Sequence, residues 1–244
     1  MFALIYLINI TYMSVFYHRA FTHRAVTLRP WFQRFIVFTG PWVTGMDIKA
    51  WACMHRLHHK YSDTRRDPHS PMNGGIWSVF LSQVWSYKRV TVGLTAERRV
   101  YTSIVRDLDF PVAWFHRIKN GSWIPYAANV ALALAIAIGF DAWILGFAYI
   151  AGAFIHPIHG WAINAFGHAF GYRNFERNDH SKNHMPTALL ILGEGFQNNH
   201  HQYPSSAKFS ARAWEFDAGF LICRILEAMR LVRIKRAALI PARP

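Results

Sequence analysis

Histidines gather in four short segments of the 244-residue chain, at spacings that could serve metal chemistry. The segments read HRAFTH, HRLHH, NAFGH and NNHH, and their histidines are His18, His23, His55, His58, His59, His168, His200 and His201. Side chains three or four residues apart share one face of a helix. We therefore expect the three histidines of HRLHH to point toward one place. Gln197, His200 and His201 repeat that spacing, and Asn164 and His168 are also neighbours four residues apart.

Metal binding explains these groups better than packing does. Several imidazoles on one helix face repel one another when protonated, whereas a metal ion binds the neutral ring through its lone pair. The number of imidazoles exceeds the three or four ligands of a single zinc site, so the pattern predicts two metal ions. His18 and His23 are five residues apart, roughly 140° on an ideal α-helix. They serve one site only if the helix bends, or they bind different ions.

Other polar residues have weaker assignments. We interpret His69, His116, His180 and His184 as interfacial or hydrogen-bonded side chains. His156 and His159 stay open between packing and support of a ligand, because ionisable groups inside a membrane tend to be functional. Carboxylates that could accept the second N–H of a ligating imidazole are Asp63, Asp67 and Glu194, with ordinary loop roles as the alternative.

The elements that must position these histidines are apolar. The chain is 52% hydrophobic with a formal charge of +14. Residues 1–17 are uncharged and predict a transmembrane helix. Residues 122–139 and 142–163 predict two more, joined by an outer turn at Asp141. Residues 31–48 contain Arg34 and a break at Gly40-Pro41, which favours a re-entrant dip or hairpin.

Sidedness follows from this arrangement. If 31–48 returns to the side it came from, all four histidine segments lie on the cytoplasmic face, and the outer segments contain no Lys or Arg, as the positive-inside rule requires. In a prokaryote that membrane is the inner membrane. The basic excess is then a membrane property, and nucleic acid is not an expected partner. The predicted fold is an all-α integral membrane protein, one domain over residues 1–244, with a helical cap holding a two-metal site.

A lipid is the natural substrate for a metal site just inside a membrane. An unactivated methylene has no acidic proton, so acid-base catalysis cannot attack it, and a metal-activated oxygen species is required. Imidazole suits zinc, copper, iron and nickel, and this chemistry favours iron.

The boxes HRAFTH, HRLHHKYSD and GEGFQNNHHQYP, with NAFGH between the second and third, resemble the membrane fatty acyl desaturases of the stearoyl-CoA desaturase type. The resemblance runs from about residue 10 to 210. It implies a non-haem di-iron oxidoreductase that inserts a cis double bond, commonly at Δ9, using O2 and two electrons. It also implies that the eight histidines named above are iron ligands and that Asn164 holds a water on one iron.

The resemblance further implies a cone of transmembrane helices below a cap with a bent hydrophobic tunnel. Candidates for its lining are Trp51, Trp77 and Trp85, with core packing as the alternative. The family has four membrane passes and both ends in the cytosol, whereas our count leaves the N-terminus outside. We therefore hypothesise that a first helix is missing from this chain.

Gln197 departs from the family pattern, which has histidine there. A neutral amide oxygen is a weaker ligand than imidazole. The glutamine is expected to ligate weakly, to hold a water, or to leave an open position.

The predicted function is therefore O2-dependent desaturation of a saturated acyl chain carried on CoA, a lipid or a carrier protein. Two iron ions, cycling between Fe2+ and Fe3+, would be supplied with electrons by a separate protein of the ferredoxin or cytochrome b5 type. One alternative is a di-iron membrane hydroxylase or oxygenase acting on a lipid or alkane. A less favoured one is a non-catalytic metal-binding membrane protein, since the histidines cluster at one face and no polar residues line a path across the membrane.

Overall fold

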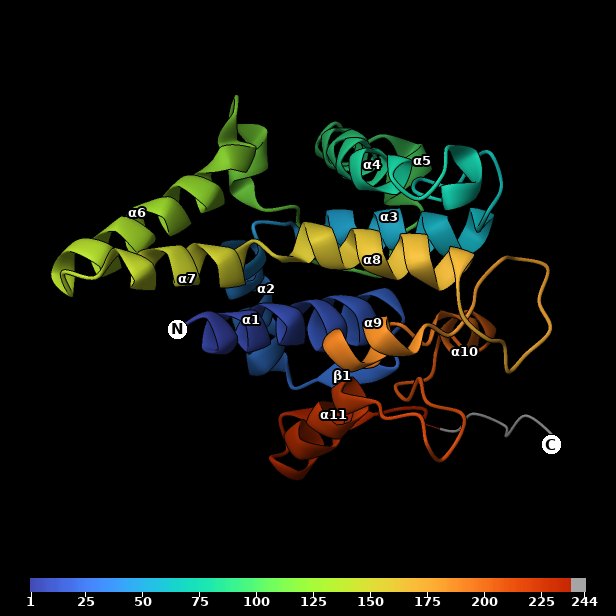
Figure 1. Cartoon of the computed structure of the whole chain (residues 1–244). Helices are drawn as coiled ribbons and strands as arrows, with labels where there is room; N and C mark the ends of the chain where they lie inside the picture. The colour runs from blue at the N-terminus through green and yellow to red at the C-terminus, as the bar shows by residue number, and fades with distance from the viewer. Residues whose placement is uncertain (238–244) are drawn as a thin grey trace.

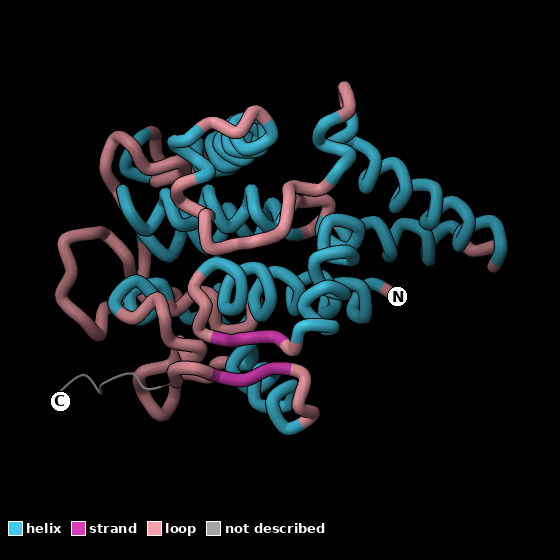
Figure 2. Tube along the Cα trace, turned by 180° about the vertical axis from the view of Figure 1, so that it is seen from behind, coloured by secondary structure: helices cyan, strands magenta, loops and turns pink. Residues whose placement is uncertain are grey.

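The computed structural model describes residues 1–237 and is mostly helical (Figure 1), which confirms the all-α prediction at that level. Two short strands are the exception. β1 (Val26–Leu28) and β2 (Val232–Ile234) form an antiparallel pair in which Val26 lies opposite Ile234 (Figure 2). The pair joins the C-terminal part of the described chain to the turn that follows the first histidine box.

The N-terminal helix changes its type along its length. α1 (Phe2–Thr11) continues directly into η1 (Tyr12–Thr22), a π-helix. In a π-helix each N–H bonds the carbonyl five residues earlier. The amide of His23 accordingly donates to the carbonyl of His18 at 3.1 Å.

The segment 31–48 is different from the expectation. α2 (Pro30–Thr44) runs through Gly40-Pro41, so the predicted break there is wrong. Gly40 lets Tyr17 pack closely, because a Cβ at residue 40 would lie 2.8 Å from the Tyr17 hydroxyl. The chain turns only at Gly45, whose φ of 71° belongs to the left-handed region that favours glycine.

The second box lies on α3 (Ile48–Tyr61), which starts where the Asp47 carboxylate accepts a hydrogen bond from the Ala50 amide. After it come η2 (Pro71–Asn73), α4 (Ser78–Thr95), α5 (Arg99–Thr102), η3 (Trp114–Arg117) and η4 (Gly121–Trp123). Asp47 also accepts from the Ala113 amide, which ties the start of α3 to the segment before α6.

α6 (Ile124–Gly139) and α7 (Trp143–Ala153) form a hairpin that projects from one side of the molecule (Figure 1), with Asp141 in its turn. The predicted helix 142–163 is divided, because α7 ends and α8 (His156–Ala169) begins after a break at Phe154 and Ile155. Pro157 has no N–H and therefore favours a helix start. The side chain of Asn9 donates to the Ala153 carbonyl at the end of α7.

Within the described residues, Gly121–Gly139 is the one helical stretch that is long and apolar enough to cross a membrane, and most of it is exposed. Large apolar side chains are exposed along the hairpin, at Val130, Leu132, Leu134, Ile138, Phe140, Trp143, Ile144 and Phe147. The finding is compatible with a membrane segment here. The multi-pass topology stays a prediction.

The remaining helices are α9 (Met185–Leu190), α10 (Gln197–Gln202) and α11 (Ala218–Ala228). The prediction of one domain over 1–244 includes residues 238–244, which lie outside the described residues. η1, α3, α8 and α10 meet at the end of the molecule away from the α6–α7 hairpin (Figure 1). Every predicted ligand lies on one of these four helices or directly after η1.

Candidate metal centre

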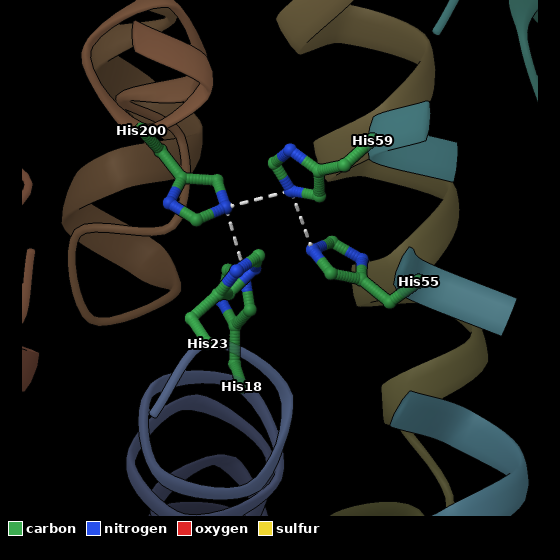
Figure 3. A group of neighbouring side chains, drawn as sticks. All are labelled: His18, His23, His55, His59 and His200. Atoms are coloured by element: carbon green, nitrogen blue, oxygen red, sulfur yellow. Dashed lines mark hydrogen bonds between the residues drawn. The ribbon is translucent and has the colours of Figure 1, made fainter. Parts of the chain in front are cut away.

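Five histidines from three segments surround one point (Figure 3). His18 belongs to η1, His23 follows it, His55 and His59 belong to α3, and His200 belongs to α10. One ring nitrogen from each lies within 4.8 Å of those of the others. Neighbouring Nε2 atoms are closer: His18 and His200 at 3.0 Å, His200 and His59 at 2.9 Å, and His59 and His55 at 3.0 Å.

The π-helix explains how His18 and His23 converge. In an α-helix residues five apart diverge, but the i to i+5 hydrogen bonding of η1 places them on the same face. Their ring centroids are 4.8 Å apart. Of the two readings that the spacing left open, the structure supports a shared site.

A second group contains His58 from α3, His168 from α8 and His201 from α10, again within 4.8 Å of one another. The expectation that the three histidines of HRLHH converge on one point is therefore wrong. His58 follows His55 by three residues and precedes His59 by one, and it faces the second group. The adjacent pair His200 and His201 likewise divides between the two groups because consecutive helical residues point about 100° apart.

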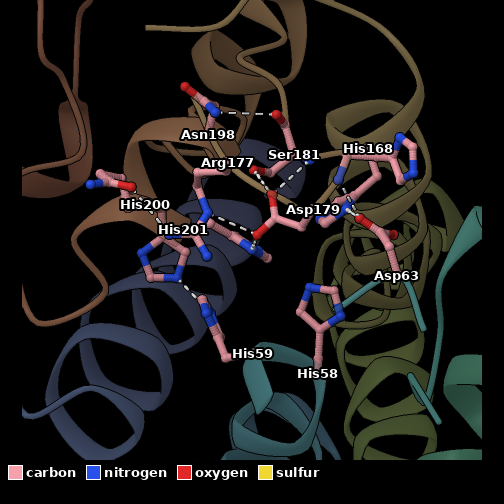
Figure 4. A network of polar contacts seen from close by, with 12 residues as sticks. His58, His59, Asp63, His168, Arg177, Asp179, Ser181, Asn198, His200 and His201 are labelled. Atoms are coloured by element: carbon pink, nitrogen blue, oxygen red, sulfur yellow. Dashed lines mark hydrogen bonds and ion pairs between the residues drawn. The ribbon is translucent and has the colours of Figure 1, made fainter. Parts of the chain in front are cut away.

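Carboxylates support four of these imidazoles from outside (Figure 4 shows Asp63 beside His168 and Asp179 beside His201). The Nδ1 atom of His18 lies 2.5 Å from Glu194, that of His58 2.9 Å from Asp67, that of His168 2.9 Å from Asp63, and that of His201 3.3 Å from Asp179. A carboxylate holds the proton on Nδ1 and so turns the Nε2 lone pair inward. The three predicted carboxylates thus contact candidate ligands, and the sequence analysis missed Asp179.

The donor atoms suit metal ions. The inward Nε2 atoms of His58, His168 and His201 are buried and have no hydrogen-bond partner within residues 1–237. The same is true of Nε2 of His23. Buried polar atoms without a partner are costly. Two nitrogens bound at about 2.1 Å to one ion and at a right angle lie about 3.0 Å apart, which matches the spacing in the five-histidine group. The residues present therefore fit two imidazole-bound ions.

Burial keeps five of the eight imidazoles neutral. Burial, reinforced by neighbouring imidazoles, holds the pKa of His23, His55, His59 and His200 well below the usual value. The same causes lower the pKa of His201 to about 3, although Asp179 opposes the shift. Neutral rings offer the lone pairs that a metal requires.

The supporting carboxylates remain ionised. Burial would raise the pKa of Asp67, but its interaction with His58 outweighs burial and lowers that pKa to about 2. The pKa of Asp63 and Asp179 also falls, through His168 and His201 respectively, despite burial. Glu194 is buried, and His18 and Arg19 still bring its pKa below the usual value.

Two amide side chains lie beside the histidine groups. Asn164 donates to the Gly160 carbonyl and Gln197 donates to the Glu194 carbonyl, both at 2.8 Å. Their oxygens, Oδ1 and Oε1, are buried without a hydrogen-bond partner in the described chain. Both residues line the same cavity as His18 and His55. An acceptor oxygen without a donor beside a metal site can bind the ion or a water on it.

That cavity extends away from the histidines between α1, α3, α4 and α8. Its apolar lining includes Ile10, Met13, Met54, Val84 and Ile163. An apolar space that is lined in part by residues of a metal site suits a chain of methylenes.

Of the predicted tunnel residues, Trp51 lines the cavity and stacks on His55 at 5.0 Å between ring centroids. Trp77 and Trp85 do not line it and are 73% and 61% exposed. Trp77 instead stacks on Trp161. Those two assignments are wrong, since aromatic spacing did not reveal which face of α4 and its start is buried.

Two other histidines differ from expectation. His159 contacts Tyr6 edge to face at 5.2 Å and lines the cavity, and its ring forms no hydrogen bond to a candidate ligand in the described chain. His69 is expected to be interfacial or hydrogen-bonded, yet it is buried beside His58 with 4.7 Å between ring centroids, and neither of its ring nitrogens has a partner within residues 1–237. Its backbone amide donates to Asp67 and so fixes the turn.

Comparison with known proteins agrees with this arrangement. The chain is 29% identical to the sn-1 stearoyl-lipid 9-desaturase of Synechocystis sp. over 223 residues, which cover 89% of this chain and 64% of that protein. It is 29% identical to Delta-9 acyl-lipid desaturase 1 of Arabidopsis thaliana, over 90% of this chain and 68% of that protein. It is 30% identical to the icosanoyl-CoA 5-desaturase of Limnanthes douglasii, over 90% and 59%. The chain thus spans about three fifths to two thirds of these relatives.

The model of the fatty acid desaturase family matches residues 1–215, which include all eight candidate ligands and their four carboxylates. The resemblance of the histidine boxes is confirmed: the chain belongs to the fatty acid desaturase family.

Proposed function

We propose that this protein is an O2-dependent fatty acyl desaturase that inserts a cis double bond at a non-haem di-iron centre. The observation that carries the proposal is the pair of adjacent buried histidine groups, of which the five-histidine group lines an apolar cavity through His18 and His55. A non-catalytic metal site needs no cavity for a chain. A desaturase needs both, because the methylenes must reach the metals while water is excluded.

The eight histidines would hold the two ions, five on one and three on the other. When bound, two iron ions with O2 and two electrons supply the oxidising power that removes two hydrogens from neighbouring methylenes. The carboxylates at Nδ1 orient the rings and hold their protons away from the ions. Asn164 and Gln197 present oxygens that would hold a water at the ion with fewer imidazoles.

For the substrate, we propose a saturated acyl chain of a membrane lipid and a double bond at Δ9. The names of the cyanobacterial relative and of the Arabidopsis relative support this choice. The Limnanthes relative is named for a CoA ester and for position 5, so its name leaves CoA as the alternative carrier. Electrons would come from a separate carrier of the ferredoxin or cytochrome b5 type.

We further propose that the protein is a multi-pass membrane protein with its metal centre on the cytoplasmic face. Support comes from the exposed apolar surface of the α6–α7 hairpin, at the opposite end from the histidines. Substrate lipid would then reach the cavity from the bilayer.

The test is expression in a host that makes no unsaturated fatty acids, together with a working reductase, followed by gas chromatography of fatty acid methyl esters. We expect a new monounsaturated ester with its double bond at Δ9. A matched His58→Ala variant is expected to make none, because the second group loses one of its three imidazoles. A protein that binds two irons under these conditions but forms no double bond would refute the proposal, and a hydroxylated ester would instead support an oxygenase.

A further inference from the structure

A second groove lies on the outer side of α2, against the segment 109–117. Its volume is about 750 Å³, within the range of about 300–1,000 Å³ that is usual for small-molecule sites. It has no lining residue in common with the cavity at the histidines. Any ligand of this groove is therefore different from the chain that reaches the metals.

Aromatic side chains and two arginines line the groove. Phe38 and Trp114 line it and are 72% and 60% exposed, and Trp42 lies between them in the lining. Arg34 and Arg117 also line it, both exposed, and neither has a side-chain hydrogen bond or an ion pair within residues 1–237. Free guanidinium groups next to exposed aromatic rings suit a ligand that is part anion and part hydrocarbon.

The carboxylates at the groove do not pair with these arginines in the described chain. Asp47 is buried, and its two oxygens accept hydrogen bonds from the amides of Ala50 and Ala113. Asp109 is exposed and contributes one negative charge. Neither carboxylate forms an ion pair with Arg34 or Arg117 within residues 1–237, so both guanidinium groups stay available to an anion.

The groove also adjoins the helix that could cross a membrane. Arg117 and Lys119 come directly before Gly121–Gly139. The side chain of Asn129, on α6, donates to the carbonyl of Trp42 at 2.8 Å, which fastens α2 to that helix. Tryptophan and basic residues are typical of the zone where a helix enters the lipid headgroups.

We propose that this groove binds one anionic glycerophospholipid, with its phosphate between Arg34 and Arg117 and an acyl chain against Phe38, Trp42 and Trp114. Guanidinium groups pair with phosphate through two parallel hydrogen bonds. A zwitterionic lipid carries its own cation beside the phosphate and gains less from the two arginines. The site is independent of the proposed desaturation, since it is separate from the cavity at the histidines.

The test compares phosphatidylglycerol with phosphatidylcholine of the same acyl chains, titrated into the detergent-purified full chain and followed by native mass spectrometry. The wild type is expected to retain phosphatidylglycerol preferentially. The double change Arg34→Gln/Arg117→Gln is expected to lower the affinity for phosphatidylglycerol by about tenfold or more, because hydrogen bonds to charged groups are lost. The affinity for phosphatidylcholine should change little. The double change Arg34→Lys/Arg117→Lys keeps the charge and should retain much of the preference.

Arg98→Gln/Arg99→Gln is the matched control, since it removes the same charge from exposed residues outside the groove. If it lowers phosphatidylglycerol binding as much as the groove variant does, the preference is a property of total charge and the proposal is wrong. Trp114→Ala should weaken the binding of both lipids, because it removes part of the surface that contacts the acyl chain. Displacement of the lipid by inorganic phosphate or glycerol phosphate at similar concentration would show an anion site without a lipid chain and would also overturn the proposal.

Discussion

Single residues of the centre work as pairs of an imidazole and a carboxylate. His201 and Asp179 are the pair whose carboxylate lies in the loop between α8 and α9. Asp179 also accepts hydrogen bonds from Arg177 and from the backbone of Ser181. The carboxylate is therefore held in place by its own loop, and it in turn fixes the orientation of the His201 ring.

Asp179→Asn tests this role. Asparagine keeps the size but not the charge, so we expect metal affinity at the three-histidine group to fall by about 10- to 100-fold while the five-histidine group keeps its ion. Metal titration with analysis of bound iron measures both. Asp109→Asn, on an exposed residue that contacts neither group, is the control. Equal loss from both groups would contradict the assignment of Asp179 to His201.

Gln197 gives a second prediction at this scale. Its oxygen is free of hydrogen bonds and faces the cavity, and its side chain packs on Gly167, next to His168. Gln197→His should retain both metal ions, because imidazole is the stronger ligand at a coordination position. Gln197→Leu, which lacks a donor atom, should leave the five-histidine ion in place. Loss of iron on Gln197→His would show that this position does not tolerate a ligand.

The sequence was sufficient to find the eight histidines, because they occur in dense groups. It was not sufficient for Asp179 or His69, because each stands in an irregular loop where no helical period relates it to the boxes. His69 points inward since its amide binds the Asp67 carboxylate, a contact that only the folded turn creates. The division of neighbouring histidines between two groups also depends on where α3 and α10 lie relative to each other.

At the scale of elements, Arg19 fastens η1 to the C-terminal part of the chain. Its guanidinium is completely buried and pairs with Glu194 at 2.7 Å and with Asp217, at the start of α11, at 2.9 Å. It also lies 3.8 Å from the centre of the Phe209 ring. Because Glu194 supports His18, this ion pair connects α11 to a candidate ligand.

Arg19→Gln should therefore destabilise the protein. It leaves two buried carboxylates without their cation, which costs about 3–5 kcal/mol. Arg19→Lys retains the charge but not the planar fork and should lose less. Denaturant unfolding of the full chain in detergent compares the two variants with the wild type. An unchanged unfolding midpoint for Arg19→Gln would mean that the pair adds nothing to stability.

Helix positions were predictable and helix types were not. Apolar runs indicated α1, α6 and α7, and the box spacing indicated α3 and α10. The π-helical hydrogen bonding of η1 leaves no trace in a hydrophobic pattern. Pro157 marks the break between α7 and α8, whereas Pro41 lies inside a continuous α2, so a proline alone does not tell a helix start from a helix interior.

For the whole molecule, the buried imidazoles make the stability of the metal-free protein depend on pH. Burial lowers the pKa of His69 and His201 to about 3, and that of four more candidate ligands well below 6.5. The unfolded chain thus binds more protons than the folded chain below pH 6.5, and stability falls as the pH drops from there toward 3. Each imidazole contributes up to about 1.4 kcal/mol per pH unit in this window.

Thermal unfolding of the metal-free protein should accordingly show a midpoint that is constant above about pH 6.5 and falls below it. The paired carboxylates act in the same direction only below their ordinary pKa, since that of Asp67 is about 2. Iron-loaded protein should hold its midpoint to lower pH because protons must first displace the ions. A midpoint that stays constant from pH 8 to about 4 would contradict neutral burial of these rings.

For the whole molecule, the fold class and the family were easy to predict and the membrane topology was not. Composition and box order were enough for the helical class and the family, both of which are confirmed. The number of membrane passes is a different matter, because one stretch of the described chain has the length and composition of a span. The N-terminal helix is interrupted by a change of type, and the segment after α6 is broken in two, so neither has the length of an ideal single helix.

The π-helical part of η1 has a consequence for chain length. A π-turn is an α-helix that carries one extra residue. Removing one residue between His18 and His23 would leave them four apart, and an ordinary α-helix would again present both rings on one face. The same deletion between His55 and His59 would leave these two histidines three residues apart, which is the spacing of His55 and His58, and those two already face different groups. A deletion of one residue at the first box can therefore be neutral for the metal site, whereas the same deletion at the second box turns His59 toward the wrong group.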